Sequence, residues 1–232
     1  MKIVGDESRA FQQIKETLYT PVVGDILDQL GFPHQFLPAE IRPLTSLVPV
    51  NTPLGKVNST KIVGYACTVL EYDIFGTPAK PFGYLTEALD QLRPYEVYIA
   101  TGAHNSALWG ELLTAAAKSK GCTGAVLDGY SRDTPRVLEQ NFPVFCRQCW
   151  AQDSSIRTYV SDYRCTIEIG QVTVRNGDLI FGDIDGVLVI PSEIIEEVLD
   201  KAFAKAAGEK KVRKAIEGGM SATKAFAEFG IL

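Results

Sequence analysis

The sequence predicts an α/β fold in which a parallel βαβ unit is followed by a part built from short strands. Two apolar segments, residues 96–100 and 124–127, are separated by a helical run of about one and a half dozen residues, which fits a crossover between neighbouring parallel strands. Beyond residue 163, short apolar runs alternate with turn signals such as Asn176-Gly177, a pattern typical of a β-meander or a barrel-like arrangement.

The size and composition of the chain favour one compact domain. Its 232 residues are 46% apolar, which is enough to build a core, so we expect a single domain over residues 1–232. The net charge is -5, and no run of Lys or Arg is dense enough to track a phosphate backbone, so we expect no direct nucleic-acid partner. The basic cluster Lys210–Lys214 is interpreted as the solvated end of a helix.

The start of the chain and its hydropathy predict a protein outside the membrane. Asp6 and Glu7 stand where a signal peptide would need its apolar segment, and no window approaches roughly eighteen uninterrupted apolar residues. We therefore expect no membrane partner and a cytoplasmic location.

The five cysteines, an odd number scattered along the chain, predict reduced thiols rather than a disulfide framework. Cys146 and Cys149 have the spacing of a redox pair or of half a zinc site. A zinc site needs further ligands, and Cys122 and Cys165 form no second pair of this spacing. We favour a structural role in which Cys146 ends a short strand, residues 143–145.

The first predicted elements are two amphipathic N-terminal helices at about residues 8–31. Apolar residues recur at helical spacing on each, with a break at Thr20-Pro21 and an end at Gly31. Asp25 and Asp28 are three apart on the second helix. This spacing could hold a metal, but a solvated helix face is the preferred interpretation.

A connecting segment and one long strand lead into the βαβ unit. Residues 33–60 are rich in proline and show no helical period, so we expect an irregular connection. Residues 61–70 predict a largely buried strand, residues 74–84 a loop, and residues 85–92 a short helix that stops at Arg93-Pro94.

The final third predicts short strands and then C-terminal helices at about residues 192–229. The strands are expected at 165–169, 172–174, 179–181 and 187–190. Asp183-Ile184-Asp185-Gly186 imitates the start of a calcium-binding loop, but a strand follows where further ligands would be required, so we predict a turn.

The βαβ unit carries the candidate site. Glu111 lies early in the predicted connecting helix, and Arg132 and Asp133 follow the second strand, so all three are expected at the carboxyl edge of the sheet. A carboxylate can bind a hard cation, a guanidinium can clamp a substrate carboxylate, and a helix starting near Gly110 would offer free N–H groups. On spacing alone, an alternative is a surface ion pair between Arg132 and Glu111, with Asp133 capping the next segment.

At these residues the chain resembles the family that joins class II 4-hydroxy-4-methyl-2-oxoglutarate aldolases with RraA-type regulators of ribonuclease activity. The resemblance covers about residues 20–202 and rests on several motifs in the same order. They are Val23-Gly24-Asp25-Ile26-Leu27-Asp28-Gln29-Leu30-Gly31, Ile62-Val63-Gly64-Tyr65-Ala66, Trp109-Gly110-Glu111-Leu112-Leu113, Gly124-Ala125-Val126-Leu127-Asp128-Gly129-Tyr130-Ser131-Arg132-Asp133, and Gly182-Asp183-Ile184-Asp185-Gly186 with Pro191.

The resemblance implies a swivelling β/β/α domain assembled as homotrimers or homohexamers. It implies that Asp133 binds Mg²⁺ or Mn²⁺, that Arg132 binds substrate, and that Gly110, Glu111, Leu112 and Leu113 line the substrate pocket. Glu111 is implied to hold a water on the metal. The family commonly has aspartate at position 111 and an acidic residue at position 136, where this chain has Glu111 and Arg136.

The function implied is a divalent-metal-dependent lyase that cleaves the C3–C4 bond of a small 2-oxo acid through pyruvate enolate. Retro-aldol cleavage and oxaloacetate decarboxylation share this intermediate. Arg132 and Glu111 are the candidate catalytic residues, and His104 is the second choice for the base. The alternative function is a non-catalytic regulator that binds and inhibits an RNA-degrading enzyme. A methyltransferase is disfavoured, because residues 101–105 contain only one glycine where a cofactor loop would need several.

Overall fold

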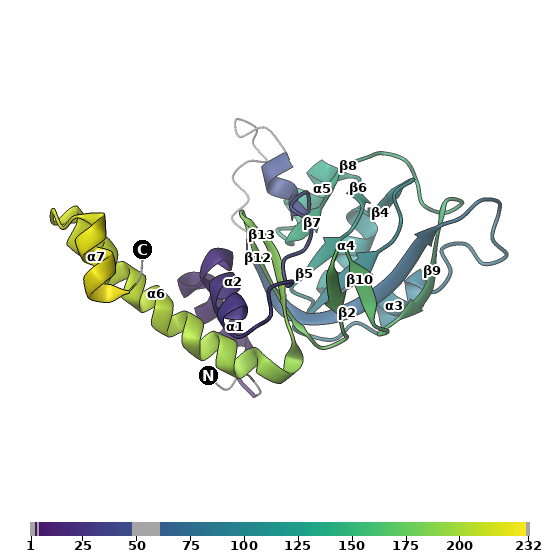
Figure 1. Cartoon of the computed structure of the whole chain (residues 1–232). Coiled ribbons are helices and arrows are strands. Elements are labelled where there is room, and N and C mark those ends of the chain that lie inside the picture. Colours follow the sequence, from purple (N-terminus) through teal and green to yellow (C-terminus); the bar gives the residue numbers. More distant parts are fainter. Residues whose placement is uncertain (1–2, 4, 48–60, 231–232) are drawn as a thin grey trace.

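A computed structural model describes residues 3, 5–47 and 61–230 (Figure 1). The helices are α1 Glu7–Thr17, α2 Thr20–Gln29, η1 Leu44–Leu47, α3 Leu85–Asp90, α4 Glu111–Ser119, α5 Thr134–Glu139, η3 Ser192–Ile194, α6 Ile195–Glu217 and α7 Ala222–Phe229. The strands are β1 Arg42–Pro43, β2 Ile62–Asp73, β3 Glu96–Thr101, β4 Ala107–Trp109, β5 Gly124–Leu127, β6 Tyr130–Ser131, β7 Val144–Cys146, β8 Gln148–Cys149, β9 Thr158–Tyr163, β10 Ile167–Ile169, β11 Val172–Val174, β12 Leu179–Asp183 and β13 Gly186–Ile190.

The main sheet has the strand order β1-β7-β5-β3-β2-β12-β13, and β9 also pairs with β2. Strands β2, β3, β5 and β7 are mutually parallel, whereas β12 and β13 form an antiparallel hairpin that pairs with β2. Because β2 is 12 residues long, it can pair with β12 through its first half and with β9 through its second. The predicted parallel βαβ unit is confirmed in β3, α4 and β5.

The sheet curves into a nearly closed barrel. The segment before β1 pairs with the far edge: Leu37 donates its N–H to the Val187 carbonyl, and Val189 donates to the Gln35 carbonyl, both at 2.9 Å. Arg42 in β1 then donates to the Ile184 carbonyl at 3.0 Å. The two ends of the sheet are therefore joined, which covers most of its exposed edges.

The two faces of the sheet hold separate parts of the core. Inside the barrel, Ile99 and Phe145 pack with Ile169 of the β10–β11 hairpin. Outside, Tyr98 packs with residues of α3, α4 and α5. A third cluster joins α1, α2 and α6 to β12 and β13, and Figure 1 shows these helices grouped at that end of the sheet. Because β3 is buried on both faces, its sequence reads as one continuous apolar run.

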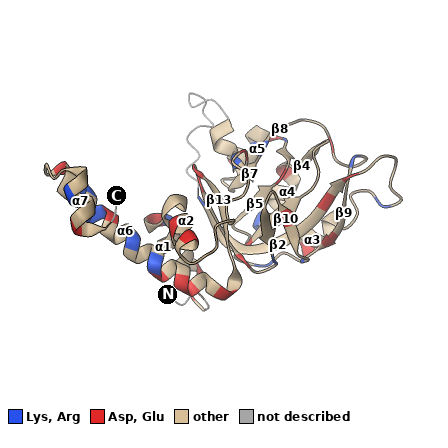
Figure 2. Ribbon diagram, viewed as in Figure 1, with Lys and Arg blue, Asp and Glu red and all other residues tan. Residues whose placement is uncertain are grey.

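The C-terminal helices extend the molecule to one side. Figure 1 shows α6 reaching away from the sheet, with α7 beside its distal end. Acidic and basic residues alternate along α6 in Figure 2, and the predicted basic cluster is exposed near its carboxyl end, except for the buried Val212. Within the described residues, no helix combines the length and apolar character needed to cross a membrane.

Several details differ from the sequence prediction. The connecting helix α4 has 9 residues, because the short strand β4 occupies part of the crossover. The late strands do not form one continuous meander: β10 pairs with β11 in a separate hairpin, whereas β12 and β13 join the main sheet. The predicted connection at 33–60 contains β1 and η1, and its part from 48 to 60 lies outside the described residues.

Candidate functional site

The first turn of α4 is held by the hydroxyl of a buried threonine. Gly110 is the N-cap residue, and α4 begins at Glu111. Thr114 donates its hydroxyl to the Gly110 carbonyl at 2.9 Å and accepts a hydrogen bond from the indole N–H of Trp109 at 2.7 Å. The helix start is thus tied to the end of β4. One backbone N–H group of its first turn, that of Glu111, points towards Asp133 in the segment that follows β6.

A small parallel sheet of β4, β6 and β8 aligns the residues of the site. Trp109 pairs with Ser131, and Arg132 donates its backbone N–H to the Trp109 carbonyl at 2.9 Å. Segments that follow parallel strands leave at the same edge. Gly110 follows β4, Arg132 follows β6, and Asp153 comes a few residues after β8. This sheet brings together residues that are far apart in the sequence.

Asp133 turns its carboxylate towards the start of α4. It is the N-cap residue of α5 with a left-handed backbone (φ 55°), but its side chain makes no capping hydrogen bond to that helix. Its Oδ2 instead accepts the backbone N–H of Glu111 at 3.2 Å. The capping role considered from the sequence is therefore not the one the side chain adopts. A non-glycine residue in this conformation is uncommon, and such residues cluster at functional sites.

Arg132 lies between two carboxylates. Its Nη1 is 2.8 Å from Oδ1 of Asp153, and its Nε is 3.7 Å from Oδ2 of Asp133. Hydrogen bonding from Ser155, together with the charge of Arg132, lowers the pKa of Asp153. The guanidinium thus pairs with Asp153 and Asp133, and not with Glu111 as the alternative interpretation of the sequence had it. The Arg132 side chain is 37% exposed, so it remains accessible to a ligand.

A cavity of about 260 Å³ opens beside these residues. Five of the residues predicted to bind substrate or metal line it: Gly110, Leu112, Leu113, Arg132 and Asp133. The rest of the wall comes from Asp153, Ser154 and a largely apolar set made of Phe82, Leu85, Thr86, Leu89, Ala107, Leu108 and Trp109. Ligand pockets commonly start at about 300 Å³, so this space suits a small molecule.

Glu111 reaches the site through its backbone. Its side chain is exposed, and the cavity is lined by its neighbours on both sides. The Glu111 charge is one of the influences that raise the pKa of Arg136, after the hydrogen bond and the charge of Glu139. Arg136 pairs with Glu139 at 3.0 Å on the exposed side of α5. Arg136, one of the two positions that depart from the family pattern, therefore pairs with Glu139 and does not line the cavity.

The other sequence candidates lie outside this cavity. His104 is exposed on the loop after β3, where its backbone N–H donates to Asp73 at 3.0 Å. Cys146 ends β7 as predicted, and all five cysteines are free. Burial raises the pKa of the Cys146 thiol to about 12, which keeps it protonated and unreactive. Asp25 pairs with Lys205 of α6.

Asp153 was missed by sequence reasoning. It follows β8, a strand of only two residues, and so short a strand leaves no periodic signal. Phe82 and Ser154 were missed for a related reason, because both lie on loops whose packing depends on β9. The order of the short strands β4, β6 and β8 along the chain could have pointed to Asp153. Their pairing, however, depends on the tertiary structure, so the sequence alone does not reveal it.

The donor set around Asp133 fits a magnesium-class cation. Within the described residues, no group of three or more His, Cys, Asp or Glu residues could enclose a metal. A tetrahedral zinc site is therefore a poor match. Mg²⁺ and Mn²⁺ bind through one or two carboxylates and keep several waters. The half-exposed Asp133 carboxylate on the cavity wall meets that requirement, and substrate oxygens would complete the shell.

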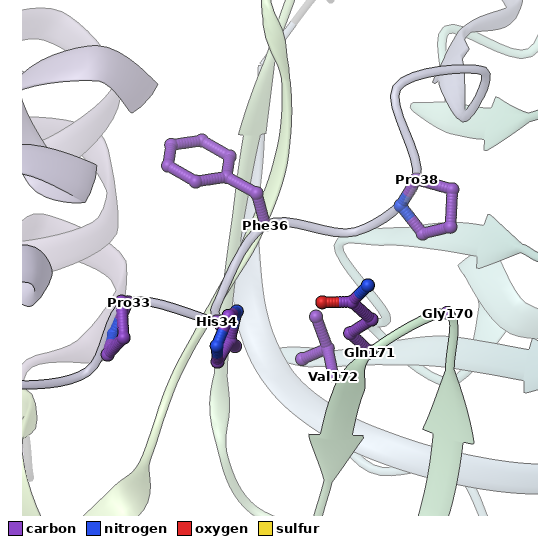
Figure 3. Close-up of a pocket in the computed structure, with 7 residues that line it drawn as sticks. All are labelled: Pro33, His34, Phe36, Pro38, Gly170, Gln171 and Val172. Atoms are coloured by element: carbon purple, nitrogen blue, oxygen red, sulfur yellow. The ribbon is translucent and has the colours of Figure 1, made fainter.

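A second cavity, of about 320 Å³, lies between residues 33–38 and the β10–β11 turn (Figure 3). The polar side chains of its described lining are His34 and Gln171, and the lining includes no Asp, Glu, Lys or Arg. It therefore offers neither a carboxylate for a hard cation nor a cation for a substrate carboxylate. The candidate site is the cavity at α4.

Two relatives illustrate the similarity of the sequence to known proteins. Protein DlpA of Legionella pneumophila is 30% identical over 199 residues, which are 85% of this chain and 30% of DlpA. The chain thus spans less than a third of the length of DlpA. A Halalkalibacterium halodurans protein, provisionally named a 4-hydroxy-4-methyl-2-oxoglutarate aldolase, is 36% identical over 144 residues, which are 61% of this chain and 68% of that protein.

Solved structures and a family model agree on the fold. An uncharacterized protein from Pseudomonas syringae has a TM-score of 0.76 at 28% identity, covering 94% of this chain and 96% of that one. Streptomyces coelicolor RraAS2, described as an unusual member of the RNase ES inhibitor RraA protein family, has a TM-score of 0.71 at 23% identity, covering 88% and 96%. The family model described as RraA-like: Aldolase/RraA matches residues 20–189. The chain therefore belongs to the RraA-like family.

Proposed function

We propose that this protein is a divalent-metal-dependent carbon–carbon lyase that cleaves the C3–C4 bond of a small 2-oxo acid through pyruvate enolate. The observation that carries the proposal is the convergence of Arg132, Asp133 and the start of α4 on one cavity. The provisional aldolase name of the H. halodurans relative supports the same class of reaction.

The residues divide the chemistry of the reaction between them. Arg132 would bind the substrate carboxylate, with Asp153 holding the guanidinium in place at 2.8 Å. A cation on Asp133 would polarise the 2-ketone and stabilise negative charge on the enolate. The first turn of α4 leaves the N–H groups of Leu112 and Leu113 without intrahelical acceptors, so they could bind a substrate oxygen. Glu111 would take the C4 hydroxyl proton through a water molecule.

The missing side chain of Gly110 leaves room for the Asp133 carboxylate. A Cβ at this position would lie 2.6 Å from Oδ2 of Asp133 and 3.3 Å from Cγ of Arg132. Glycine keeps the carboxylate beside the helix start. The requirement for glycine is steric rather than conformational. The Gly110 backbone is extended (φ -166°), a conformation that any residue can adopt.

The test is pyruvate release by the purified protein. Oxaloacetate, 4-hydroxy-4-methyl-2-oxoglutarate and 4-hydroxy-2-oxopentanoate should each be incubated with Mg²⁺ or Mn²⁺, with chelator, and without protein, because metal ions alone decarboxylate oxaloacetate. Metal-dependent release above the protein-free rate supports the proposal. If no substrate gives such release, the lyase is ruled out and the regulator of an RNA-degrading enzyme becomes the better hypothesis.

Variants locate the activity. Asp133→Ala and Arg132→Ala should each reduce kcat/KM by at least about a hundred-fold, because each removes a charge that acts on the developing enolate. Asp28→Ala and Arg175→Ala are matched controls: Asp28 is exposed on α2, and Arg175 pairs with Glu193 at 3.9 Å, away from the cavity. Full activity in both Asp133 and Arg132 variants would place the site elsewhere.

A further inference from the structure

The charged groups of the cavity are confined to one part of its wall. Among the described residues that line it, Arg132 is the only cation and Asp133 and Asp153 are the only anions. Arg132 pairs with Asp153 at 2.8 Å and with Asp133 at 3.7 Å. All the charge in the lining is therefore located where the proposed 2-oxo acid head group would bind.

The remainder of the wall is apolar. Phe82, Leu85 and Leu89 come from α3 and the loop before it, Leu108 from β4, and Leu112 and Leu113 from α4. Leu85, Leu89 and Leu108 belong to the buried core that supports this face of the sheet, so their positions are set by packing. Leu112 is 78% exposed, which leaves its side chain free to cover a ligand.

Two basic residues close in sequence to residues of the lining, Arg157 and Lys80, already have partners. Arg157 donates through Nη1 to the Asp153 backbone carbonyl at 3.0 Å, on the charged side of the site. Lys80 pairs with Glu87 and lies over the Tyr84 ring. Neither residue lines the cavity. Within the described residues, a second carboxylate on the substrate would have no cation to pair with in the apolar part.

We propose that the physiological substrate is a 4-hydroxy-2-oxo acid with a single carboxylate and an apolar substituent on C4. This inference rests on the proposed lyase function. On cleavage, the C4 hydroxyl proton passes to the base and the C3–C4 electron pair forms the enolate. C3 then takes up a proton to give pyruvate, and C4 leaves as the carbonyl carbon of an apolar aldehyde or ketone.

Charge balance supports a single carboxylate. The described lining residues carry one positive and two negative side chains, so a divalent cation would leave one surplus positive charge. One substrate carboxylate neutralises it. A second would be left unpaired against leucine and phenylalanine side chains, which is costly, whereas each buried methylene should raise kcat/KM by about four-fold.

The test uses two substrates that differ at one group. 4-Hydroxy-2-oxopentanoate carries a methyl on C4, and 4-hydroxy-2-oxoglutarate carries a carboxylate at the same place. We expect kcat/KM for pyruvate release to be at least about ten-fold higher for the methyl compound, and higher again for 4-hydroxy-2-oxohexanoate. A preference for the dicarboxylate overturns the inference while leaving the lyase intact. If none of the three gives pyruvate while oxaloacetate or 4-hydroxy-4-methyl-2-oxoglutarate does, the inference alone is overturned. Absence of pyruvate from all five compounds overturns the lyase and the inference with it.

Binding gives a second readout that needs no turnover. With Mg²⁺ present, 2-oxo-4-methylpentanoate should raise the melting temperature more than 2-oxoglutarate at equal concentration, because the ligand that binds more tightly stabilises the folded state more. Both compounds share the 2-oxo acid head group, so the difference reports the apolar end. Equal shifts, or a larger shift with 2-oxoglutarate, would contradict the proposed specificity.

A charge placed in the apolar wall should reverse the preference. Thr86 lines the cavity but is exposed on α3, so its replacement should not disturb the core. Thr86→Arg should lower the methyl-to-carboxylate ratio of kcat/KM by about ten-fold, whereas the uncharged Thr86→Gln should change the ratio less than about two-fold. If both variants change the ratio equally, the selectivity does not arise from charge at this wall.

Discussion

The missing Cβ of Gly110 leaves the space in which Asp133 places its carboxylate. A methyl group there would lie 2.6 Å from Asp133 Oδ2, well inside van der Waals contact. Gly110→Ala should therefore displace Asp133 and reduce metal-dependent pyruvate release by at least about ten-fold, with a stability cost of about 1–3 kcal/mol from overpacking. Gly218→Ala, at the end of α6, is the control and should keep wild-type activity. Equal activity in the two variants would contradict the steric role.

Asp153 should act by positioning Arg132. Both side chains are more than a third exposed, so solvent screening limits the pair to about 1 kcal/mol, and Asp153→Asn should lower kcat/KM by about five-fold. The decrease should appear mainly in KM. In an Arg132→Ala background the same change should have no further effect, which a double-mutant cycle measures. Additive effects would show that Asp153 acts on the substrate directly.

The buried Glu71 should make stability depend on pH. Burial raises its pKa from 4.5 to about 7, although Thr158 donates a hydrogen bond to Oε1 at 2.9 Å. Within the described residues, Oε2 has no hydrogen-bond partner. The folded protein thus holds this proton more tightly than the unfolded chain. The contribution of Glu71 to the free energy of unfolding is greatest below about pH 4.5. It falls by on the order of 3 kcal/mol as the pH rises to about 7.

Glu71→Gln tests this dependence. The amide cannot ionise, so its urea midpoint should change less between about pH 5 and pH 8 than that of the wild type, and the variant should be the more stable of the two at pH 8. Glu168, exposed on β10, offers a control in Glu168→Gln, which should follow the wild type. Parallel pH profiles for the wild type and Glu71→Gln would contradict the raised pKa.

Asp183 should be a structural residue rather than a calcium ligand. Its carboxylate accepts the backbone N–H of Thr20 at 2.8 Å, the Thr20 hydroxyl at 2.7 Å and the Asp185 N–H at 2.9 Å, so it holds the start of α2 from β12. Asp183→Ala leaves these donors unpaired in a buried place and should cost about 2–4 kcal/mol in urea unfolding. Ile184→Ala, at an exposed position in the same turn, is the control. A rise of the melting temperature with Ca²⁺ that is kept in Asp133→Ala but lost in Asp183→Ala would contradict this role.

Much of the fold follows from local sequence patterns. The continuous apolar runs of β3 and β5 and the amphipathic periods of α1 and α2 are local properties, so the parallel βαβ unit and the paired helices could be predicted. The strands of two or three residues could not, because they are stabilised by partners far away in the chain rather than by their own composition. Strand β6 is formed by pairing with β4 and β8, where Ser131 meets Trp109 and Cys149.

The sequence by itself determined the α/β class, the parallel unit and the presence of Gly110, Arg132 and Asp133 near one edge of the sheet. Residue order sets which segments leave the ends of which strands, and apolar periodicity sets the strands. Only the tertiary structure decided that Asp133 turns to the Glu111 N–H, that Asp153 holds Arg132, and that the rest of the cavity is apolar. These are contacts between separate segments, and packing in three dimensions alone can specify them.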